Sequence, residues 1–195
     1  LEEFLSFVPR STVVVVDEAY IEYVQSPDYP KSLELLEKYD NLMILRTFSK
    51  AYGLASLRIG YGVSSQKMIT VLNKVRQPFN VNSIAMKAAE LSLDNTSHLK
   101  KSIKLNEDGK LQLYSALEDM GLRYQKTEGN FIFIETAYSA REIFEDMLLE
   151  GVIIRPMSFF GRDNAIRVTI GTESDNNTFI KCFKRVLKKI DEQES

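Results

Sequence analysis

The sequence predicts an α/β fold followed by a small α+β domain, and the order of strands and helices carries this prediction. Residues 13–16 are a run of valines, which is typical of a strand that is buried on both faces. Residues 32–38 predict a helix, and residues 42–45 form a second apolar strand. The alternation of strand, helix and strand favours a parallel sheet covered by helices. After Gly121 the pattern changes, which indicates a second domain.

The first domain continues with a third strand and a helix. Residues 57–63 are largely apolar and contain Gly60 and Gly62, which indicate a bend or a close approach of the backbone. Residues 83–93 are rich in good helix formers, such as Ala85, Met86 and Glu90, and predict a helix. We therefore expect residues 1–95 to form one domain and residues 96–195 to form a second, small domain that includes a connecting helix.

The second domain is predicted to contain a long helix, a capped helix and an amphipathic last helix. Residues 97–120 form the long helix, and Gly109 predicts a break or bend because glycine costs about 1 kcal/mol relative to alanine. Ser139 and Glu142 form a capping box that opens the next helix, and Gly151 ends it. Strands are expected at residues 131–134, 152–154 and 166–170.

The composition argues against several classes of function. The 25 basic and 27 acidic residues give a net charge of −2, which does not favour nucleic acid as a partner. No apolar run approaches the length of about 18 residues that a membrane span needs. The single Cys182 and the single His98 exclude a disulfide framework and argue against a zinc site. We expect no metal, no membrane partner and a reducing compartment, with Cys182 in the core and His98 at the surface.

Side chains with chemical function gather where two of the predicted strands end. They are Asp17 and Tyr20 after the first strand, Thr47, Ser49 and Lys50 after the second, and Arg58 near the third. Ligands bind at the carboxyl ends of strands in parallel α/β sheets. Pyridoxal 5′-phosphate requires an amine, a carboxylate at its ring nitrogen, and hydroxyls and an arginine at its phosphate. Spacing alone leaves ordinary roles open, such as a solvated lysine or an arginine paired with a surface acid.

Longer motifs resemble those of the fold-type I aminotransferases, which depend on pyridoxal phosphate. Residues 47–55 (TFSKAYGLA), followed by RIGY, resemble the segment with the cofactor lysine, and residues 17–20 (DEAY) resemble the ring-nitrogen motif. Three further motifs resemble the histidinol-phosphate aminotransferase branch: FNVN at 79–82, GVIIRPM at 151–157 and IRVTIGT at 166–172. The resemblance runs over most of the chain. Ser56 departs from it, because the family usually has glycine there.

The resemblance implies a fold and a set of cofactor contacts. Residues 1–95 would be part of the large, mainly parallel domain that binds the cofactor, and residues 96–195 would be the small carboxyl-terminal domain. Lys50 would form a Schiff base with pyridoxal phosphate and move a proton during the reaction. Asp17 would pair with the ring nitrogen, and Tyr20 would hydrogen-bond the ring oxygen. The cofactor phosphate would be held by Thr47, Ser49 and Arg58.

Three residues of the second domain match the family's substrate-binding positions. Arg167 would bind the α-carboxylate of the substrate, Arg155 would help to hold the substrate's own phosphate, and Asn130 would lie near the substrate. A structural ion pair remains the alternative for Arg167, because an unpaired charge inside an apolar strand is costly.

The activity that the resemblance implies is transamination between glutamate and imidazole-acetol phosphate in histidine biosynthesis. A cytoplasmic homodimer is implied as well. Two alternatives stay open: a related decarboxylase of phosphorylated amino acids, and an effector-binding domain of a transcription regulator. The chain begins at Leu1 and matches only the later half of the family, so we expect a fragment that could lack activity by itself.

Overall fold

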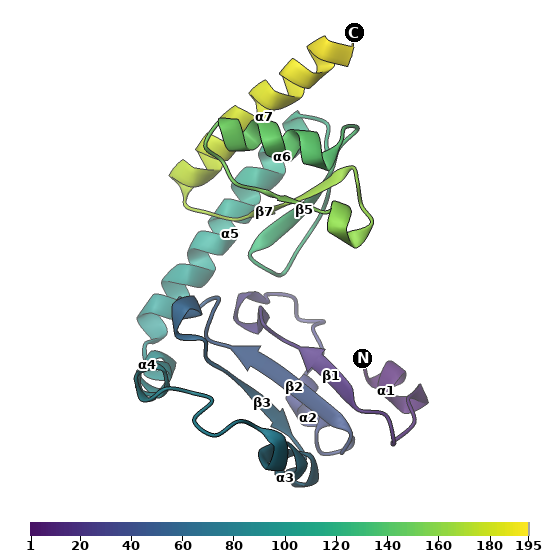
Figure 1. Cartoon of the computed structure of the whole chain (residues 1–195), viewed down its shortest axis with the longest axis vertical. Coiled ribbons are helices and arrows are strands. Elements are labelled where there is room, and N and C mark those ends of the chain that lie inside the picture. The colour runs from purple at the N-terminus through teal and green to yellow at the C-terminus, as the bar shows by residue number, and fades with distance from the viewer. Residues whose placement is uncertain (195) are drawn as a thin grey trace. The chain divides into compact units, whose positions relative to one another are not determined.

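The computed structural model describes residues 1–194, which form two compact units, residues 1–102 and residues 103 onward. Both units combine helices with a sheet (Figure 1), which confirms the predicted mixed α/β class. Within the described residues, no helix has both the length and the apolar character that would allow it to cross a membrane.

The first unit contains a three-stranded sheet with the order β1-β2-β3 (Figure 1). β1 (Val14–Asp17) and β2 (Leu42–Thr47) run parallel, and Asp17 lies opposite Leu45. β3 (Gly60–Ser64) runs antiparallel to β2. The third strand was predicted to begin at residue 57 but begins at Gly60, because residues 55–57 form a short 3-10 helix. The carboxyl ends of β1 and β2 lie at one edge of the sheet, where the functional side chains were predicted.

Several short helices complete the first unit. They are α1 (Glu2–Phe7), η1 (Ile21–Tyr23), α2 (Ser32–Leu35), η2 (Ala55–Leu57), α3 (Gln66–Val75) and α4 (Ser83–Asp94). α5 (Thr96–Asp119) contains the boundary between the two units. His98 is exposed, as predicted.

Burial along β1 corrects one expectation. The strand was predicted to be buried on both faces, but Val13 is 57% and Val15 is 50% exposed. Val14 and Val16 instead pack against a cluster formed by α1, α2 and β2. Successive strand residues point to opposite faces, so α1 and α2 cover only the face that carries Val14 and Val16. The prediction was therefore wrong for the face that carries Val15.

The second unit contains an antiparallel sheet with the order β4-β5-β7-β6. Its strands are β4 (Arg123–Gln125), β5 (Phe131–Glu135), β6 (Arg155–Pro156) and β7 (Ala165–Thr169). α6 (Ala140–Leu149), η3 (Ser158–Phe160), α7 (Glu173–Glu194) and the later part of α5 complete it. Buried side chains from α5, α6, α7 and the sheet form one apolar core, and Cys182 lies in it as predicted.

The helix start at the Ser139 N-cap was predicted correctly, whereas the strand after this helix was not. The Ser139 hydroxyl accepts a hydrogen bond from the Glu142 amide, and Gly151 adopts a positive φ of 78°. The Val152 amide then donates to the Met147 carbonyl at 2.9 Å, so residues after Gly151 complete the helix end. Residues 152–154 are therefore not a strand, and β6 follows at Arg155–Pro156.

Gly109 does not break the long helix, which corrects a second expectation. α5 is continuous from Thr96 to Asp119. A β-carbon at Gly109 would lie 2.5 Å from Cγ2 of Ile170 and 2.9 Å from Nδ2 of Asn176. The glycine therefore allows a close approach of the segment after β7 and the start of α7, and its low helix propensity is offset by that packing.

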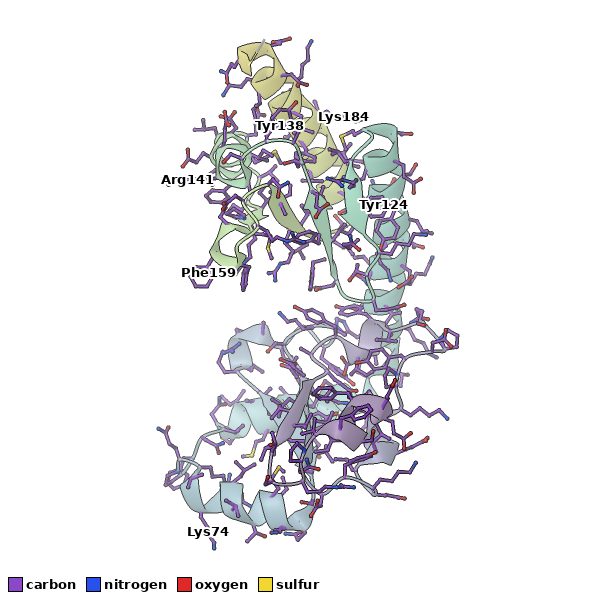
Figure 2. All side chains as sticks on the ribbon, turned by 90° about the vertical axis from the view of Figure 1, so that its right-hand side faces the viewer. Lys74, Tyr124, Tyr138, Arg141, Phe159 and Lys184 are labelled. Atoms are coloured by element: carbon purple, nitrogen blue, oxygen red, sulfur yellow. The ribbon has the colours of Figure 1, made fainter. Side chains whose placement is uncertain are left out.

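Tyr124 of β4 is labelled in Figure 2, and its contacts raise the pKa of its hydroxyl. Its ring stacks on Tyr114 with 4.7 Å between centroids, and its hydroxyl donates to Glu118 at 2.6 Å. The hydrogen bond to Glu118, with a smaller contribution from burial, raises the pKa of Tyr124 to about 12. Because the folded-state pKa is raised, this contact stabilises the fold below the unfolded-state pKa of about 10. The stabilisation is lost as the pH rises from there through 12.

We expect Glu118→Gln to lower the pKa of Tyr124 towards that of an ordinary tyrosine, because the charged acceptor is lost. Ultraviolet titration of tyrosinate would show one group ionising earlier than in the native-sequence chain. Tyr124→Phe, which removes the Tyr124 hydroxyl itself, is the matched control. An unchanged titration curve in Glu118→Gln would contradict this interpretation.

Candidate functional site

Two strand ends present polar side chains on the same face of the first sheet. Asp17 closes β1, and one of its carboxylate oxygens accepts a hydrogen bond from the Ala19 amide at 3.0 Å. Thr47 closes β2, and its hydroxyl accepts from the Ser49 amide at 3.1 Å. Asp17 lies opposite Leu45, and Thr47 is two residues further along β2, so Asp17 and Thr47 share one face. The loops that follow both strands begin with short local turns.

Lys50 is brought to the segment that follows β1. Its Nζ lies 5.3 Å from the centroid of the Tyr20 ring, within the range of a cation–π contact. The Lys50 carbonyl accepts from the Gly53 amide at 2.9 Å, which fixes the turn after the lysine. Lys50 is half-buried, and no carboxylate of residues 1–193 forms an ion pair with it. Its amine therefore lies at the predicted edge of the sheet without an acidic partner.

Arg58 closes the loop that begins after Thr47. Its backbone is left-handed, with a φ of 55°, which is uncommon for a residue with a side chain. Its guanidinium donates to the Ala55 carbonyl at 2.7 Å. Gly60, two residues later, begins β3 opposite Thr47, and a β-carbon there would lie 2.7 Å from the Arg46 carbonyl oxygen. The antiparallel pairing thus brings the two ends of the loop, with Ser49 and Arg58, to the same edge.

A buried ion pair that was not predicted from the sequence lies next to these strand ends. Glu18 is 2% exposed, and its Oε2 accepts from Nε of Arg46 at 3.0 Å and from Nη2 at 2.9 Å. Burial disfavours the charge of Arg46, but hydrogen bonds to Glu18 and Tyr61 outweigh it and raise the pKa of the guanidinium. The signal in the sequence was a pair of charged residues directly beside Asp17 and Thr47.

The second unit holds two arginines side by side. Arg155 of β6 and Arg167 of β7 are opposite each other in the antiparallel register. The Arg167 guanidinium carbon lies 4.8 Å from the centroid of the Phe131 ring. In the described part of the chain neither arginine forms an ion pair. The alternative that Arg167 forms a structural ion pair is therefore not supported there. Like charges in direct opposition are unfavourable, and this arrangement suits an anionic ligand.

Asn130 precedes β5 in the same sheet. Its carbonyl accepts from the Ile170 amide at 2.9 Å, which ties it to the end of β7. Its side chain is half-buried. The sheet therefore holds Asn130 by its backbone at the strand that carries Arg167.

The two groups of side chains suit different ligands. The first unit offers an amine, a carboxylate, a phenol, two hydroxyls and a guanidinium, a set that could hold a phosphorylated aldehyde cofactor. The second offers two guanidinium groups for anions. Among the side chains of residues 1–193, no group of three or more histidine, cysteine, aspartate and glutamate residues could hold a metal ion.

Comparison with known proteins agrees with this chemistry. The profile of the family "Aminotransferase class I and II" matches residues 1–183. The chain is 48% identical over 189 residues to histidinol-phosphate aminotransferase 2 of Pseudomonas fluorescens, covering 97% of this chain and 51% of the relative. It is also 48% identical over 188 residues to histidinol-phosphate aminotransferase of Moorella thermoacetica, covering 96% of this chain and 49% of the relative. The chain spans about half the length of the curated relatives it matches.

A solved structure agrees as well. The histidinol-phosphate aminotransferase of Sinorhizobium meliloti, solved in complex with pyridoxal 5′-phosphate, matches with a TM-score of 0.88 and 26% identity. The match covers 97% of this chain and 53% of that one. These findings confirm the resemblance predicted from the motifs around Lys50 and the predicted fold class. The chain belongs to the aminotransferase class I and II family.

Proposed function

We propose that the protein containing this chain is a pyridoxal-phosphate-dependent aminotransferase that interconverts histidinol phosphate and imidazole-acetol phosphate, with glutamate and 2-oxoglutarate as the second pair. The observation that carries the proposal is the position of Lys50. Its amine lies against Tyr20, at the carboxyl end of two parallel strands, in a chain that matches histidinol-phosphate aminotransferases along 97% of its length. We further propose a cytoplasmic homodimer that acts in histidine biosynthesis.

The residues of the first unit fit the cofactor. Pyridoxal phosphate, when bound, supplies a ring that withdraws electrons from the substrate Cα. Lys50 would hold the cofactor through its Nζ and carry the proton that leaves Cα. Asp17 would keep the ring nitrogen protonated, and Tyr20 would donate a hydrogen bond to the ring oxygen. The phosphate would be bound by the side chains of Thr47, Ser49 and Arg58, which lie at the two ends of the loop between β2 and β3.

The residues of the second unit fit the substrate. Both substrates of the proposed reaction carry anionic groups, and Arg155 and Arg167 offer two neighbouring cations without acidic partners in the described chain. We assign Arg167 to the α-carboxylate of glutamate or 2-oxoglutarate and Arg155 to the phosphate of histidinol phosphate, with Asn130 nearby. In domain terms, residues 1–95 would belong to the cofactor-binding domain and residues 96–195 to the small domain.

The experiment that tests the cofactor assignment is covalent trapping. The chain is incubated with pyridoxal phosphate, reduced with borohydride and digested, and the modified lysine is located by mass spectrometry. We expect a single adduct, on Lys50. Adducts scattered over many lysines, or none, would contradict the proposed cofactor site.

Product analysis tests the reaction. The complete gene product is supplied with histidinol phosphate and 2-oxoglutarate, and we expect one glutamate for each imidazole-acetol phosphate. When a phosphorylated amino acid is supplied instead, release of carbon dioxide without a 2-oxoacid would indicate a decarboxylase. Specific binding to DNA, without turnover, would indicate an effector-binding domain of a regulator.

Removal of one of the paired arginines is expected to have opposite effects on stability and on binding. Arg155→Gln removes like-charge repulsion between β6 and β7 and should raise the free energy of unfolding by about 0.2–1 kcal/mol. The same change should raise the KM for histidinol phosphate about tenfold or more, because a hydrogen bond to a charged group is worth about 1.5–3 kcal/mol. Denaturant unfolding of the chain and steady-state kinetics of the complete gene product measure the two effects.

Arg123→Gln is the matched control. Arg123 also lies opposite a charged residue across two strands, but that residue is Glu135, with 3.7 Å between Nε and Oε2. Its replacement should not raise stability and should leave the KM unchanged. Equal effects of Arg155→Gln and Arg123→Gln on both quantities would exclude a substrate role for Arg155.

A further inference from the structure

We propose that Glu18 and Arg46 are positioning residues that hold the two strand ends of the cofactor site in register, and thereby set where Lys50 lies relative to Asp17. This inference rests on the proposed function, because it assigns the pair a role in shaping the proposed cofactor site. Within the described residues, the side chains of Glu18 and Arg46 form hydrogen bonds and an ion pair with each other and with Ser32, and none of these bonds goes to a side chain assigned to the cofactor or the substrate. Both are one position away from a residue that is assigned to the cofactor, since Glu18 follows Asp17 and Arg46 precedes Thr47.

The contacts of Glu18 link three segments of the first unit. One carboxylate oxygen accepts two hydrogen bonds from Arg46, at 3.0 and 2.9 Å, and the other accepts from the hydroxyl of Ser32 at the start of α2. The backbone amide of Glu18 donates to the Leu45 carbonyl at 2.8 Å. The end of β1 is thus bound to the end of β2 through both backbone and side chain. Both oxygens of the carboxylate are used.

The pair lies on the face of the sheet opposite to the site. Side chains alternate between the two faces of a strand, so Glu18 and Arg46 point away from the face that presents Asp17 and Thr47. The neighbours of the pair support this placement. Arg46 is opposite Tyr61 of β3, whereas Thr47 is opposite Gly60. The ion pair can therefore fix the backbone of both strand ends without occupying the face of the sheet that presents Asp17 and Thr47.

The burial of this pair argues that it is more than a surface contact. Among the ion pairs formed by the side chains of residues 1–193, only this one contains a side chain with 0% exposure, that of Glu18, while the side chain of Arg46 is 20% exposed. A buried ion pair is often no more stabilising than an apolar pair of similar volume, so stability alone does not explain it. Two donors on one oxygen instead fix the geometry between strands. The loops that this geometry orients are those that bring Tyr20 and Lys50 within 5.3 Å.

The test compares Glu18→Gln and Arg46→Lys with the native-sequence chain. Amide hydrogen exchange is measured without cofactor over residues 18–23 and 46–50, and the yield of the borohydride-trapped adduct on Lys50 is measured with pyridoxal phosphate. In Glu18→Gln we expect exchange in both segments to be about tenfold faster or more, because local opening is less costly. The adduct on Lys50 should fall by about tenfold relative to the native sequence. Arg46→Lys keeps the charge but loses the two-donor geometry, so its effects should be intermediate and should remain measurable if Glu18→Gln does not fold.

Asp146→Asn is the matched control. It removes another partly buried ion pair, between Asp146 and Lys189 in the second unit, with a 2.7 Å distance from Nζ to Oδ1. It should leave exchange in both segments and the adduct on Lys50 unchanged. A general loss of stability would speed exchange throughout the first unit and spread adducts to surface lysines such as Lys74, whereas the positioning role changes only the two strand ends and Lys50.

The outcomes separate this inference from the proposed function. If the native-sequence chain forms no adduct on Lys50, the proposed cofactor site fails, while the exchange rates still decide the role of the pair. If the adduct forms and a folded Glu18→Gln or Arg46→Lys shows native exchange at both strand ends, the positioning role is overturned. Faster exchange at both ends together with a weaker Lys50 adduct establishes it.

Discussion

Replacing Lys50 by arginine is expected to abolish the borohydride-trapped adduct with pyridoxal phosphate while leaving the fold intact. Arginine keeps the positive charge and the contact with the Tyr20 ring, from which Nζ of Lys50 is now 5.3 Å away. A guanidinium cannot take the place of an amine as the nucleophile that bonds to the cofactor aldehyde. Mass spectrometry after reduction should show no modification at position 50, and circular dichroism should be unchanged.

The same substitution should reduce turnover of the complete gene product by at least about 10²–10⁴-fold, which is the typical contribution of a positioned acid–base group. Lys74→Arg is the matched control. Lys74 lies near the end of α3 in the same unit, and its side chain projects from the surface (Figure 2). This control should retain both the adduct on Lys50 and the activity. A Lys50→Arg variant that still forms a single adduct elsewhere would assign the cofactor lysine to another position.

The chemistry at the edge of the first sheet could be predicted because it depends on local sequence. Two apolar runs end in polar residues, and parallel strands place their carboxyl ends at one edge. That reasoning identified Asp17, Tyr20 and Lys50 as neighbours, and the structure places the amine of Lys50 by the ring of Tyr20. The roles of these residues remain proposals, which the trapping experiment tests.

Features that depend on register could not be predicted in the same way. The Glu18–Arg46 pair joins residues on different strands, and no local pattern fixes how the strands are aligned. The opposition of Arg155 and Arg167 has the same origin. It also requires β6 to begin at Arg155 instead of Val152, a shift that follows from the way residues after Gly151 end α6.

Helix α3 was missed for a different reason. It contains Ile69, Thr70 and Val71 in succession, and β-branched residues lower helix propensity. Its start is fixed by Ser65, whose hydroxyl accepts from the Met68 amide. A serine three residues before a methionine is a weak signal in the sequence, because the capping box needs glutamate or glutamine at that place.

Gly109→Ala is expected to destabilise the second unit although alanine favours a helix. Alanine would contribute about 1 kcal/mol through helix propensity. Its β-carbon, however, would lie 2.5 Å from Cγ2 of Ile170 and 2.9 Å from Nδ2 of Asn176. Asn176 is 2% exposed, and its side chain bonds the Gly171 amide at 2.9 Å and the Gln112 side chain at 3.0 Å. Displacement of Asn176 would leave buried polar groups unpaired.

Overpacking typically costs about 1–3 kcal/mol, and each unpaired buried polar group costs a further 1–3 kcal/mol or so. We therefore expect a net loss of about 1–3 kcal/mol in the free energy of unfolding, measured by urea denaturation. Ser115→Ala, at an exposed position of the same helix, gains propensity without a clash and should be neutral or stabilising. In the background Asn176→Ala, which removes one of the two clashing groups, the cost of Gly109→Ala should be smaller. Equal costs in the two backgrounds would show that Asn176 does not explain the glycine, and a stabilised Gly109→Ala would show that the close approach to Ile170 is not required by the fold.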